Sequence, residues 1–257
     1  MGARLGQHFL ADPSILDRIA AAAALGRDET VLEIGPGRGT LTRALAARAA
    51  RVWAIEADRR LAAALAASCA PNVTVVAGDA LRVPWPAADV VCGNIPYQIT
   101  SPLIERALTP PRPARVVFLV QREVADRLAA EPGGRTWGAL SAGVQLVATV
   151  ERLFRVPAGA FRPRPRVDSA VVRLTPRAAP LVGSPEEERR VRRLVQAAFQ
   201  RRRQQLARTL REAFGVEREA AEGMLAAAGA APLSRVEVLA PAQLVTLARA
   251  LGPRLGS

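Results

Sequence analysis

The stretch TVLEIGPGRGT, residues 30–40, is the part of the sequence from which the fold is best predicted. Its first six residues form a short apolar run typical of a buried β-strand, and a helical pattern starts at Thr40. Between them, Gly35, Gly37 and Gly39 allow the backbone to turn sharply and to approach a ligand closely. Such a loop alone is weak evidence of a nucleotide site, because many strand-to-helix turns contain glycines for packing.

Strand-like runs alternate with helical stretches over about the first two-thirds of the chain, which is typical of a parallel sheet with crossover helices. From Ser184 onward no strand-like run occurs. We therefore predict an α/β, Rossmann-like domain at residues 1–183 and a small all-helical domain at 184–257. After the first strand, the expected strands are 51–56, 72–79, 89–94, 115–121, 149–156 and 167–176.

Composition and charge narrow the class of partner. Half of the 257 residues are hydrophobic, which excludes a disordered chain. The formal net charge is +13, and all 36 basic residues are Arg because the sequence contains no Lys. The planar guanidinium suits phosphate groups, so we expect a polyanionic partner. No apolar run approaches the length of a bilayer span, and we expect nucleic acid rather than a membrane.

Few residues could hold a metal ion. With one histidine, Cys69 and Cys92 cannot complete a disulfide framework or a tetrahedral zinc site. The sequence shows no secretory signal and nothing that suggests an obligate dimer. We therefore expect a cytoplasmic monomer that uses no metal.

Acidic residues follow the glycine loop at the ends of the next two strands. Glu56 lies about 20 residues after the loop, where an acid can accept hydrogen bonds from ribose hydroxyls. Asp79 ends the third strand, where a carboxylate can accept from an adenine amino group. Each acid alone is better explained as a solvated loop residue, but together with the loop they favour a bound adenosine. S-adenosylmethionine suits an E-x-G-x-G-x-G loop better than NAD does, since it has no pyrophosphate to rest on the helix.

The stretch CGNIPYQITSP, residues 92–102, follows the fourth strand and contains the only tyrosine. A tight turn is one explanation. The other is a site for a planar base, since NIPY is similar to the Asn/Asp-Pro-Pro-Tyr signature of amino-methyltransferases. The adenine amino nitrogen is a poor nucleophile, and the Asn94 side-chain oxygen and the Ile95 carbonyl could accept its hydrogens and localise its lone pair. Pro96 would rigidify the turn, and Tyr97 would stack on the base.

A base inside a duplex cannot enter such a pocket, so the target must be flipped out or lie in a loop. We expect a second aromatic ring on the other face of the base. Phe161, in the loop GAFRPRPRVDSA, is the candidate, although an ordinary core residue explains it about as well.

Basic residues gather in two late segments. Arg162, Arg164 and Arg166 alternate with prolines beside the expected pocket, where they would guide an RNA strand. Arg201, Arg202 and Arg203 lie in an expected helix, so at least one or two of them must face solvent. A merely solvated face is the usual fate of such a run, but the strongly basic chain favours phosphate contact.

Seven motifs lie in order along the chain: GQHFL (6–10), EIGPGRGTLT (33–42), GDAL (78–81), NIPYQITSPL (94–103), FLVQREVADRL (118–128), AFRPRPRVDSAVVRL (160–174) and FQRRRQQLARTL (199–210). Their order and spacing resemble those of the ribosomal RNA adenine N6-dimethyltransferase family. The resemblance is greatest to the KsgA-type members that act on 16S rRNA, and it extends from Gly6 to about Leu251.

This resemblance implies a class I S-adenosylmethionine-dependent methyltransferase domain followed by a helical domain that binds RNA or the ribosome. The implied reaction is N6-dimethylation of two adjacent adenosines in the 3′-terminal hairpin loop of 16S rRNA, in the assembling small ribosomal subunit. The family usually has Asn where this chain has His8, and an imidazole that can donate or accept should be tolerated. The implied cofactor contacts are His8, Leu10, Gly35, Glu56, Asp79 and Asn94, to which the glycine loop adds Gly37.

Three alternatives stay open. Erm-type enzymes methylate 23S rRNA and confer macrolide resistance, and the core motifs barely separate them from the 16S enzymes. The chain could also be a small-subunit assembly factor for which methylation is secondary. A DNA adenine methyltransferase is the third alternative, although no additional target-recognition domain is evident.

Overall fold

The computed structural model describes residues 8–256, which divide into two compact units. The first holds the residues up to Ala125 together with Val150–Pro176, and the second holds Asp126–Thr149 together with the residues from Arg177 onward. This division differs from the boundary that we predict at residue 184. Residues 126–149 belong with the later helices because α6 (Ala139–Gln145) packs on α7 (Pro185–Gln200).

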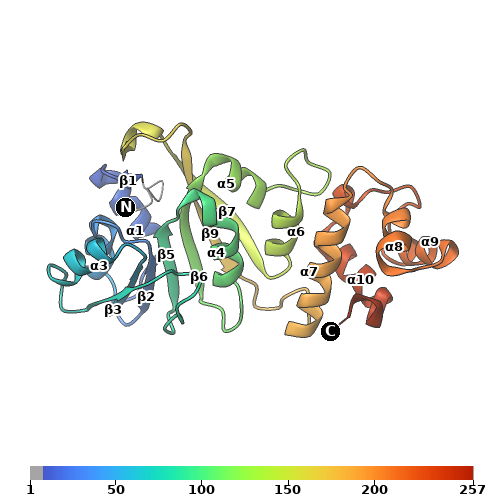
Figure 1. Ribbon diagram of the computed structural model, residues 1–257, viewed down its shortest axis with the longest axis horizontal. Helices are drawn as coiled ribbons and strands as arrows, with labels where there is room; N and C mark the ends of the chain where they lie inside the picture. Colours follow the sequence, from blue (N-terminus) through green and yellow to red (C-terminus); the bar gives the residue numbers. More distant parts are fainter. Residues whose placement is uncertain (1–7, 257) are drawn as a thin grey trace. The chain divides into compact units, whose positions relative to one another are not determined.

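Seven strands form one sheet in the order β4-β3-β2-β5-β6-β9-β7 (Figure 1). The first five in this order pair in parallel, and β9 pairs antiparallel to β6, which confirms the predicted α/β, Rossmann-like fold. A separate two-stranded sheet pairs β1 antiparallel to β8. The bounds are β1 Phe9–Leu10, β2 Thr30–Ile34, β3 Arg51–Glu56, β4 Val73–Ala77, β5 Val90–Asn94, β6 Arg115–Gln121, β7 Ala148–Val156, β8 Phe161–Arg162 and β9 Ser169–Pro176.

Helices connect the strands and then form most of the second unit (Figure 1). Two helices of the first unit begin at an aspartate whose side chain accepts from main-chain N–H groups of the first turn, as helix N-termini require. Asp12 accepts from Ser14 at 2.9 Å, and Asp58 accepts from Arg60 at 2.8 Å. The remaining bounds are α1 Pro13–Ala22, α2 Thr40–Ala46, α3 Arg59–Ala66, α4 Thr100–Ala107, α5 Arg122–Leu128, α8 Leu206–Phe214, α9 Arg218–Ala227 and α10 Pro241–Leu251.

The helix that we expect to continue through the arginine run is interrupted. α7 ends at Gln200 and α8 begins at Leu206, so Arg201–Arg203 lie in a turn and not on a helix. Leu206 is buried, and its N–H donates to the Ser234 carbonyl at 2.8 Å. The start of α8 is therefore set by its own packing and not by continuation of α7.

Both faces of the central sheet are buried. Val31, Val90 and Cys92 pack into the core cluster that includes side chains of α1 and α2. Leu32 and Ile34 alternate with Val31 along β2, so they face the other side of the sheet, where they are also buried. This pattern is expected of parallel strands that have helices on both sides.

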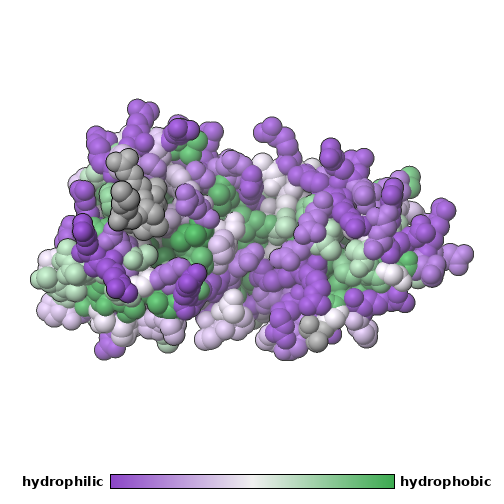
Figure 2. All heavy atoms as spheres, in the orientation of Figure 1, coloured by the Kyte–Doolittle hydropathy of each residue, from purple (hydrophilic) through white to green (hydrophobic). Residues whose placement is uncertain are grey.

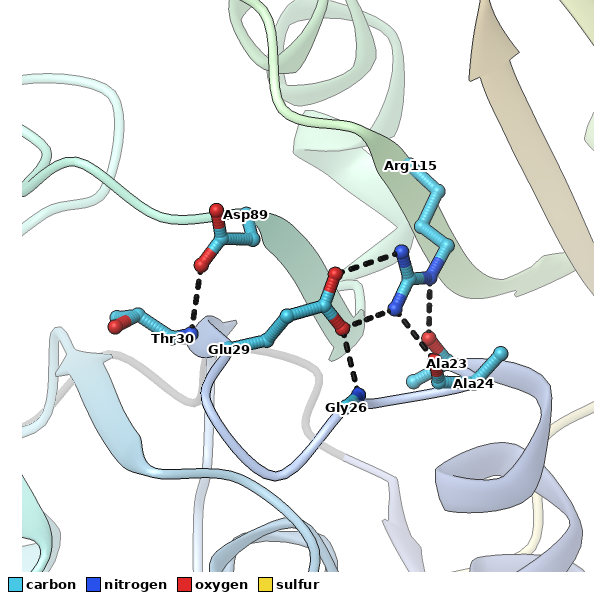
Figure 3. A network of polar contacts seen from close by, with 7 residues as sticks. All are labelled: Ala23, Ala24, Gly26, Glu29, Thr30, Asp89 and Arg115. Carbon is cyan, nitrogen blue, oxygen red and sulfur yellow. Dashed lines mark hydrogen bonds and ion pairs between the residues drawn. The ribbon is translucent and has the colours of Figure 1, made fainter.

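An ion pair joins the loop between α1 and β2 to the start of β6 (Figure 3). The Arg115 guanidinium forms two hydrogen bonds with the Glu29 carboxylate, at 3.1 and 2.5 Å, and donates to the carbonyls of Ala23 and Ala24. Glu29 also accepts from the Gly26 N–H at 2.7 Å. The bond from Arg115 is the main cause that holds the pKa of Glu29 below its ordinary value. This network fixes the loop between α1 and β2 against the sheet.

We expect Arg115→Ala to lower the free energy of unfolding by about 2 kcal/mol, because it removes the hydrogen bonds to the half-buried Glu29 carboxylate and to the carbonyls of Ala23 and Ala24. Arg48→Ala is the matched control: its pair with Asp17 is exposed and should contribute under about 1 kcal/mol. Denaturant unfolding measures both. Because the pKa of Glu29 is lowered, the stabilisation is present above its ordinary value of 4.5 and is lost as the pH falls through the folded-state pKa. Equal losses in the two variants would contradict this role.

Candidate functional site

A cavity of about 250 Å³ lies in the first unit at the carboxyl ends of β2, β3 and β5. Ligands of open α/β sheets bind at this edge, because the ends of parallel strands meet there. Its walls are largely apolar, with Ile34, Ile55 and Ile99 among them, and two carboxylates lie among the lining groups. The predicted site residues that line it are His8, Gly35, Gly37, Glu56, Asp79, Asn94, Ile95, Pro96 and Tyr97.

Two predicted residues do not line the cavity. Leu10 and Phe161 lie directly opposite each other in the β1–β8 pair, so their side chains share one face, and both are buried in the hydrophobic core. Phe161 is fully buried, so the structure favours the ordinary core residue over the base clamp. A ligand contact by Leu10 would have to involve its main chain. Phe9, which sequence analysis misses, faces the other way and lines the cavity.

The glycine loop is shaped by Phe9. Gly35, Gly37 and Gly39 all have positive φ, of 69°, 57° and 72°, a region that L side chains rarely adopt. A Cβ added to Gly37 would lie 2.9 Å from the Phe9 ring. The motif GQHFL is the only sequence signal that could have identified Phe9. The loop therefore needs glycine for its backbone conformation and also for its contact with β1.

Glu56 is fixed by main-chain donors on both sides. Its Oε2 atom accepts from the Gly37 N–H and its Oε1 atom from the Asp58 N–H, each at 2.9 Å, and the residue is 3% exposed. Asp79 accepts from the Leu81 N–H at 2.9 Å. Each carboxylate oxygen has further lone pairs, so both acids can still accept from hydroxyl or amino groups of a ligand.

Glu33, the first residue of the loop motif, lies beneath the cavity and does not line it. It is 1% exposed, and its Oε2 atom has no hydrogen-bond partner among the described residues. Burial raises the pKa of Glu33 to about 8, the Thr42 hydroxyl opposes this shift, and the charge of Glu56 adds to it. The carboxyl group is therefore mainly protonated at neutral pH.

Several polar groups of the turn after β5 are hydrogen-bonded. Asn94 donates from Nδ2 to the His8 carbonyl at 2.9 Å, which directs its Oδ1 atom away from that carbonyl. The Ile95 N–H donates to the Leu119 carbonyl at 3.1 Å. The Thr100 hydroxyl donates to the carbonyls of Pro96 and Tyr97 at 3.1 and 3.3 Å. Within residues 8–256, no donor contacts Asn94 Oδ1 or the Ile95 carbonyl.

The Tyr97 ring is packed from one side and anchored at its hydroxyl. The hydroxyl lies 3.0 Å from Ser169 Oγ, and burial is the main cause that raises the pKa of the phenol. The His8 ring lies 5.7 Å from the Tyr97 ring, centroid to centroid, with an angle of 32° between the planes. Nδ1 of His8 lies 2.8 Å from the Pro163 carbonyl oxygen. His8 thus joins β1, the 94–97 turn and the loop after Phe161.

Two of the five predicted RNA-contacting arginines form ion pairs with glutamates, and the other three are exposed. Arg201 pairs with Glu212 at 2.6 Å and Arg202 with Glu237 at 3.0 Å. Arg162 is exposed and donates to the carbonyls of its own loop. Arg164 and Arg203 are exposed. Figure 2 shows hydrophilic side chains over much of the drawn face, which agrees with the high charge.

The part of the chain that the structure describes holds no group of three or more His, Cys, Asp or Glu side chains that could bind a metal. Its helices include none that is long and apolar enough to cross a membrane.

The fold and the site together define a class I S-adenosylmethionine-dependent methyltransferase. A parallel sheet ends in a glycine loop and two acids, and the apolar walls suit an adenine ring. The cofactor fits these carboxylates because its ribose hydroxyls and amino groups are donors from which Glu56 and Asp79 can accept hydrogen bonds.

Comparisons with known proteins identify the family. The family model for ribosomal RNA adenine dimethylases matches residues 2–251. The ribosomal RNA small subunit methyltransferase A of Myxococcus xanthus (strain DK1622) is 42% identical over 256 residues, which is 96% of this chain and 90% of that protein.

Two crystal structures are similar over nearly the whole chain. A dimethyladenosine transferase from Plasmodium falciparum has a TM-score of 0.82 and 28% identity, and covers 93% of this chain and 96% of its own. The 23S rRNA methyltransferase ErmE has a TM-score of 0.74 and 33% identity, and covers 95% of this chain and 99% of its own. The chain belongs to the ribosomal RNA adenine dimethylase family, and it is an S-adenosylmethionine-dependent rRNA adenine dimethyltransferase.

We expect Glu33→Gln to flatten the pH dependence of stability. Between pH 4.5 and about 8 the folded chain keeps a proton on Glu33 that the unfolded chain has lost, so stability falls as pH rises through this window. The amide cannot titrate, so the variant should gain stability relative to the wild type by a few kcal/mol between pH 5 and pH 8. Denaturant unfolding at the two pH values measures this change. Parallel pH profiles would contradict the buried, protonated carboxyl.

We expect Glu56→Gln to raise the Kd for S-adenosylmethionine about tenfold or more. The amide NH₂ would face one of two main-chain donors, and one acceptor for the ligand would be lost, at about 1.4 kcal/mol or more. Isothermal titration calorimetry measures the change. Glu151→Gln is the control, since Glu151 pairs with Arg173 and does not line the cavity. An unchanged Kd would remove Glu56 from the cofactor site.

Proposed function

We propose that this enzyme dimethylates N6 of two adjacent adenosines in the 3′-terminal hairpin loop of 16S rRNA, within the assembling small ribosomal subunit. The family membership supports an adenine of ribosomal RNA as the substrate, and the name of the Myxococcus xanthus relative supports the small subunit. The observation that carries the proposal is the pair of unused acceptors in the 94–97 turn, Asn94 Oδ1 and the Ile95 carbonyl.

These two acceptors match the two hydrogens of an adenine amino group. Hydrogen bonds to both would draw the nitrogen lone pair out of the ring system and fix its direction. S-adenosylmethionine, when bound, supplies the electrophilic methyl group. After one transfer the nitrogen keeps a single hydrogen, which one of the two acceptors can still hold for the second transfer. Tyr97 lines the cavity, and its ring would stack on the base.

His8 is compatible with this mechanism although the family usually has Asn there. Asn94 is oriented by the main-chain carbonyl of residue 8 and not by its side chain. A change of side chain at this position therefore leaves the orientation of the Asn94 amide intact. The imidazole adds a contact to the Pro163 carbonyl, which supports the loop beside the cavity.

The exposed arginines would bind RNA phosphates. Arg164 and Arg166 lie in the loop after Phe161, and Arg203 lies in the turn between α7 and α8; all three are exposed. Arg201 and Arg202 are already paired with glutamates, so their phosphate contacts would require exchange of partners. Salt-dependent binding is expected from such contacts.

Large-subunit RNA is the second candidate substrate. The similarity to ErmE, at 33% identity over 95% of this chain, favours it. The 42% identity to a small-subunit enzyme favours the first candidate. A role as assembly factor, with methylation secondary, also predicts binding to small subunits.

Methyl transfer from labelled S-adenosylmethionine separates these functions. The substrates are undermethylated small subunits, mature small subunits and undermethylated large-subunit RNA, each digested to nucleosides afterwards. We expect N6-dimethyladenosine only with undermethylated small subunits. Label on large-subunit RNA would contradict the proposal in favour of the ErmE-like function. Tight binding to small subunits without any transfer would favour the assembly factor.

We expect Asn94→Ala to lower kcat about 100-fold or more, because an acceptor at the reacting nitrogen is lost. Binding of small subunits should persist, since the phosphate contacts are elsewhere. Asn72→Ala is the matched control: its Nδ2 atom also donates to main-chain carbonyls, those of Ala46 and Ala49, but it does not line the cavity. Equal loss of activity in the two variants would indicate a general structural effect.

A further inference from the structure

We propose that Ser169 is a positioning residue for methyl transfer, because its hydroxyl fixes the Tyr97 ring on which the target base stacks. This inference rests on the proposed function. Ser169 is the first residue of β9 and is fully buried, and its Oγ atom lies 3.0 Å from the Tyr97 hydroxyl. It does not line the cavity itself, so it acts through Tyr97.

The Tyr97 side chain is held at both of its ends. At the main chain, the Thr100 hydroxyl donates to the Tyr97 carbonyl at 3.3 Å and to the Pro96 carbonyl at 3.1 Å. At the far end, the phenol bonds to Ser169. Rotation about the Cα–Cβ bond of Tyr97 would displace the phenol hydroxyl from Ser169, so the contact fixes the direction of the ring axis. The ring is thereby held at the cavity before a base arrives, which lowers the entropic cost of stacking.

Ser169 is itself held in place by its neighbour. The Asp168 carboxylate accepts from the Ala158 N–H at 2.9 Å and from the Arg155 guanidinium, and the Asp168 carbonyl accepts from the Arg122 N–H at 3.0 Å. Ser169 pairs across the sheet with Gln121, the last residue of β6. The position of the hydroxyl is therefore set by the sheet and by the loop that follows β7.

A buried serine could also serve only to satisfy its own hydroxyl. The two roles differ in what removal of the hydroxyl changes. A positioning role predicts a lower kcat, an altered environment of the phenol and no additional loss when the phenol hydroxyl is removed as well. A purely structural role predicts reduced stability with kcat unchanged.

The experiment compares Ser169→Ala, Tyr97→Phe and the double variant in methyl transfer to undermethylated small subunits. Each should lower kcat about tenfold to 100-fold, with the KM for S-adenosylmethionine unchanged, because the contact orients the base and not the cofactor. The double variant should be no slower than Tyr97→Phe alone. Multiplicative losses would overturn the proposal, and so would wild-type kcat in folded Ser169→Ala.

A spectroscopic readout tests the contact without activity. The chain has one tyrosine, so ¹³Cζ labelling of tyrosine gives a single NMR signal that reports the phenol. We expect this signal to shift in Ser169→Ala. It should not shift in Ser141→Ala, which removes another fully buried hydroxyl that donates to the Arg127 carbonyl. An unchanged signal in Ser169→Ala overturns the proposal, whereas lack of methyl transfer by the wild type overturns the proposed function alone.

Discussion

The hydrogen bond from Asn94 Nδ2 to the His8 carbonyl is the contact on which the site depends. It joins the carboxyl end of β5 to the segment that enters β1. Because the amide nitrogen is held there, the amide oxygen is left as an acceptor at the cavity. β1 is in turn held by its pairing with β8, so the position of His8 depends on the loop around Phe161 as well. Three segments far apart in the sequence thus determine the direction of one side-chain oxygen.

Elsewhere in the site, too, hydrogen bonds within the protein hold side chains in place at the cavity. Main-chain donors hold Glu56, and Thr100 and Ser169 hold Tyr97 at its two ends. Burial raises the pKa of Glu33 to about 8, and the charge of Glu56 adds to this shift. Under the proposed function, fixed acceptors and a fixed ring would take the place of a strong base at the reacting nitrogen, which is catalysis through preorganisation.

The sequence predicted those parts of the site that lie at strand ends, because strand order and glycine turns are local properties. Gly35, Glu56 and Asp79 were found this way, and all three line the cavity. The burial of Phe161 and the position of Phe9 at the cavity could not be predicted, because they depend on the register of β1 against β8. The break between α7 and α8 was also missed, since the arginine run has good helix propensity and only the burial of Leu206 ends it. Ser169 gave no signal of its own, because its role follows from a contact across 72 residues of sequence.

The most direct test of this account is a crystal structure of the enzyme with S-adenosylhomocysteine and adenosine monophosphate bound. The account predicts that the adenine N6 atom lies within hydrogen-bond distance, about 3 Å, of both Asn94 Oδ1 and the Ile95 carbonyl oxygen, with the Tyr97 ring stacked on the base. An adenine amino group that contacts neither acceptor, or a base stacked on Phe161 after rearrangement of the β8 loop, would contradict it.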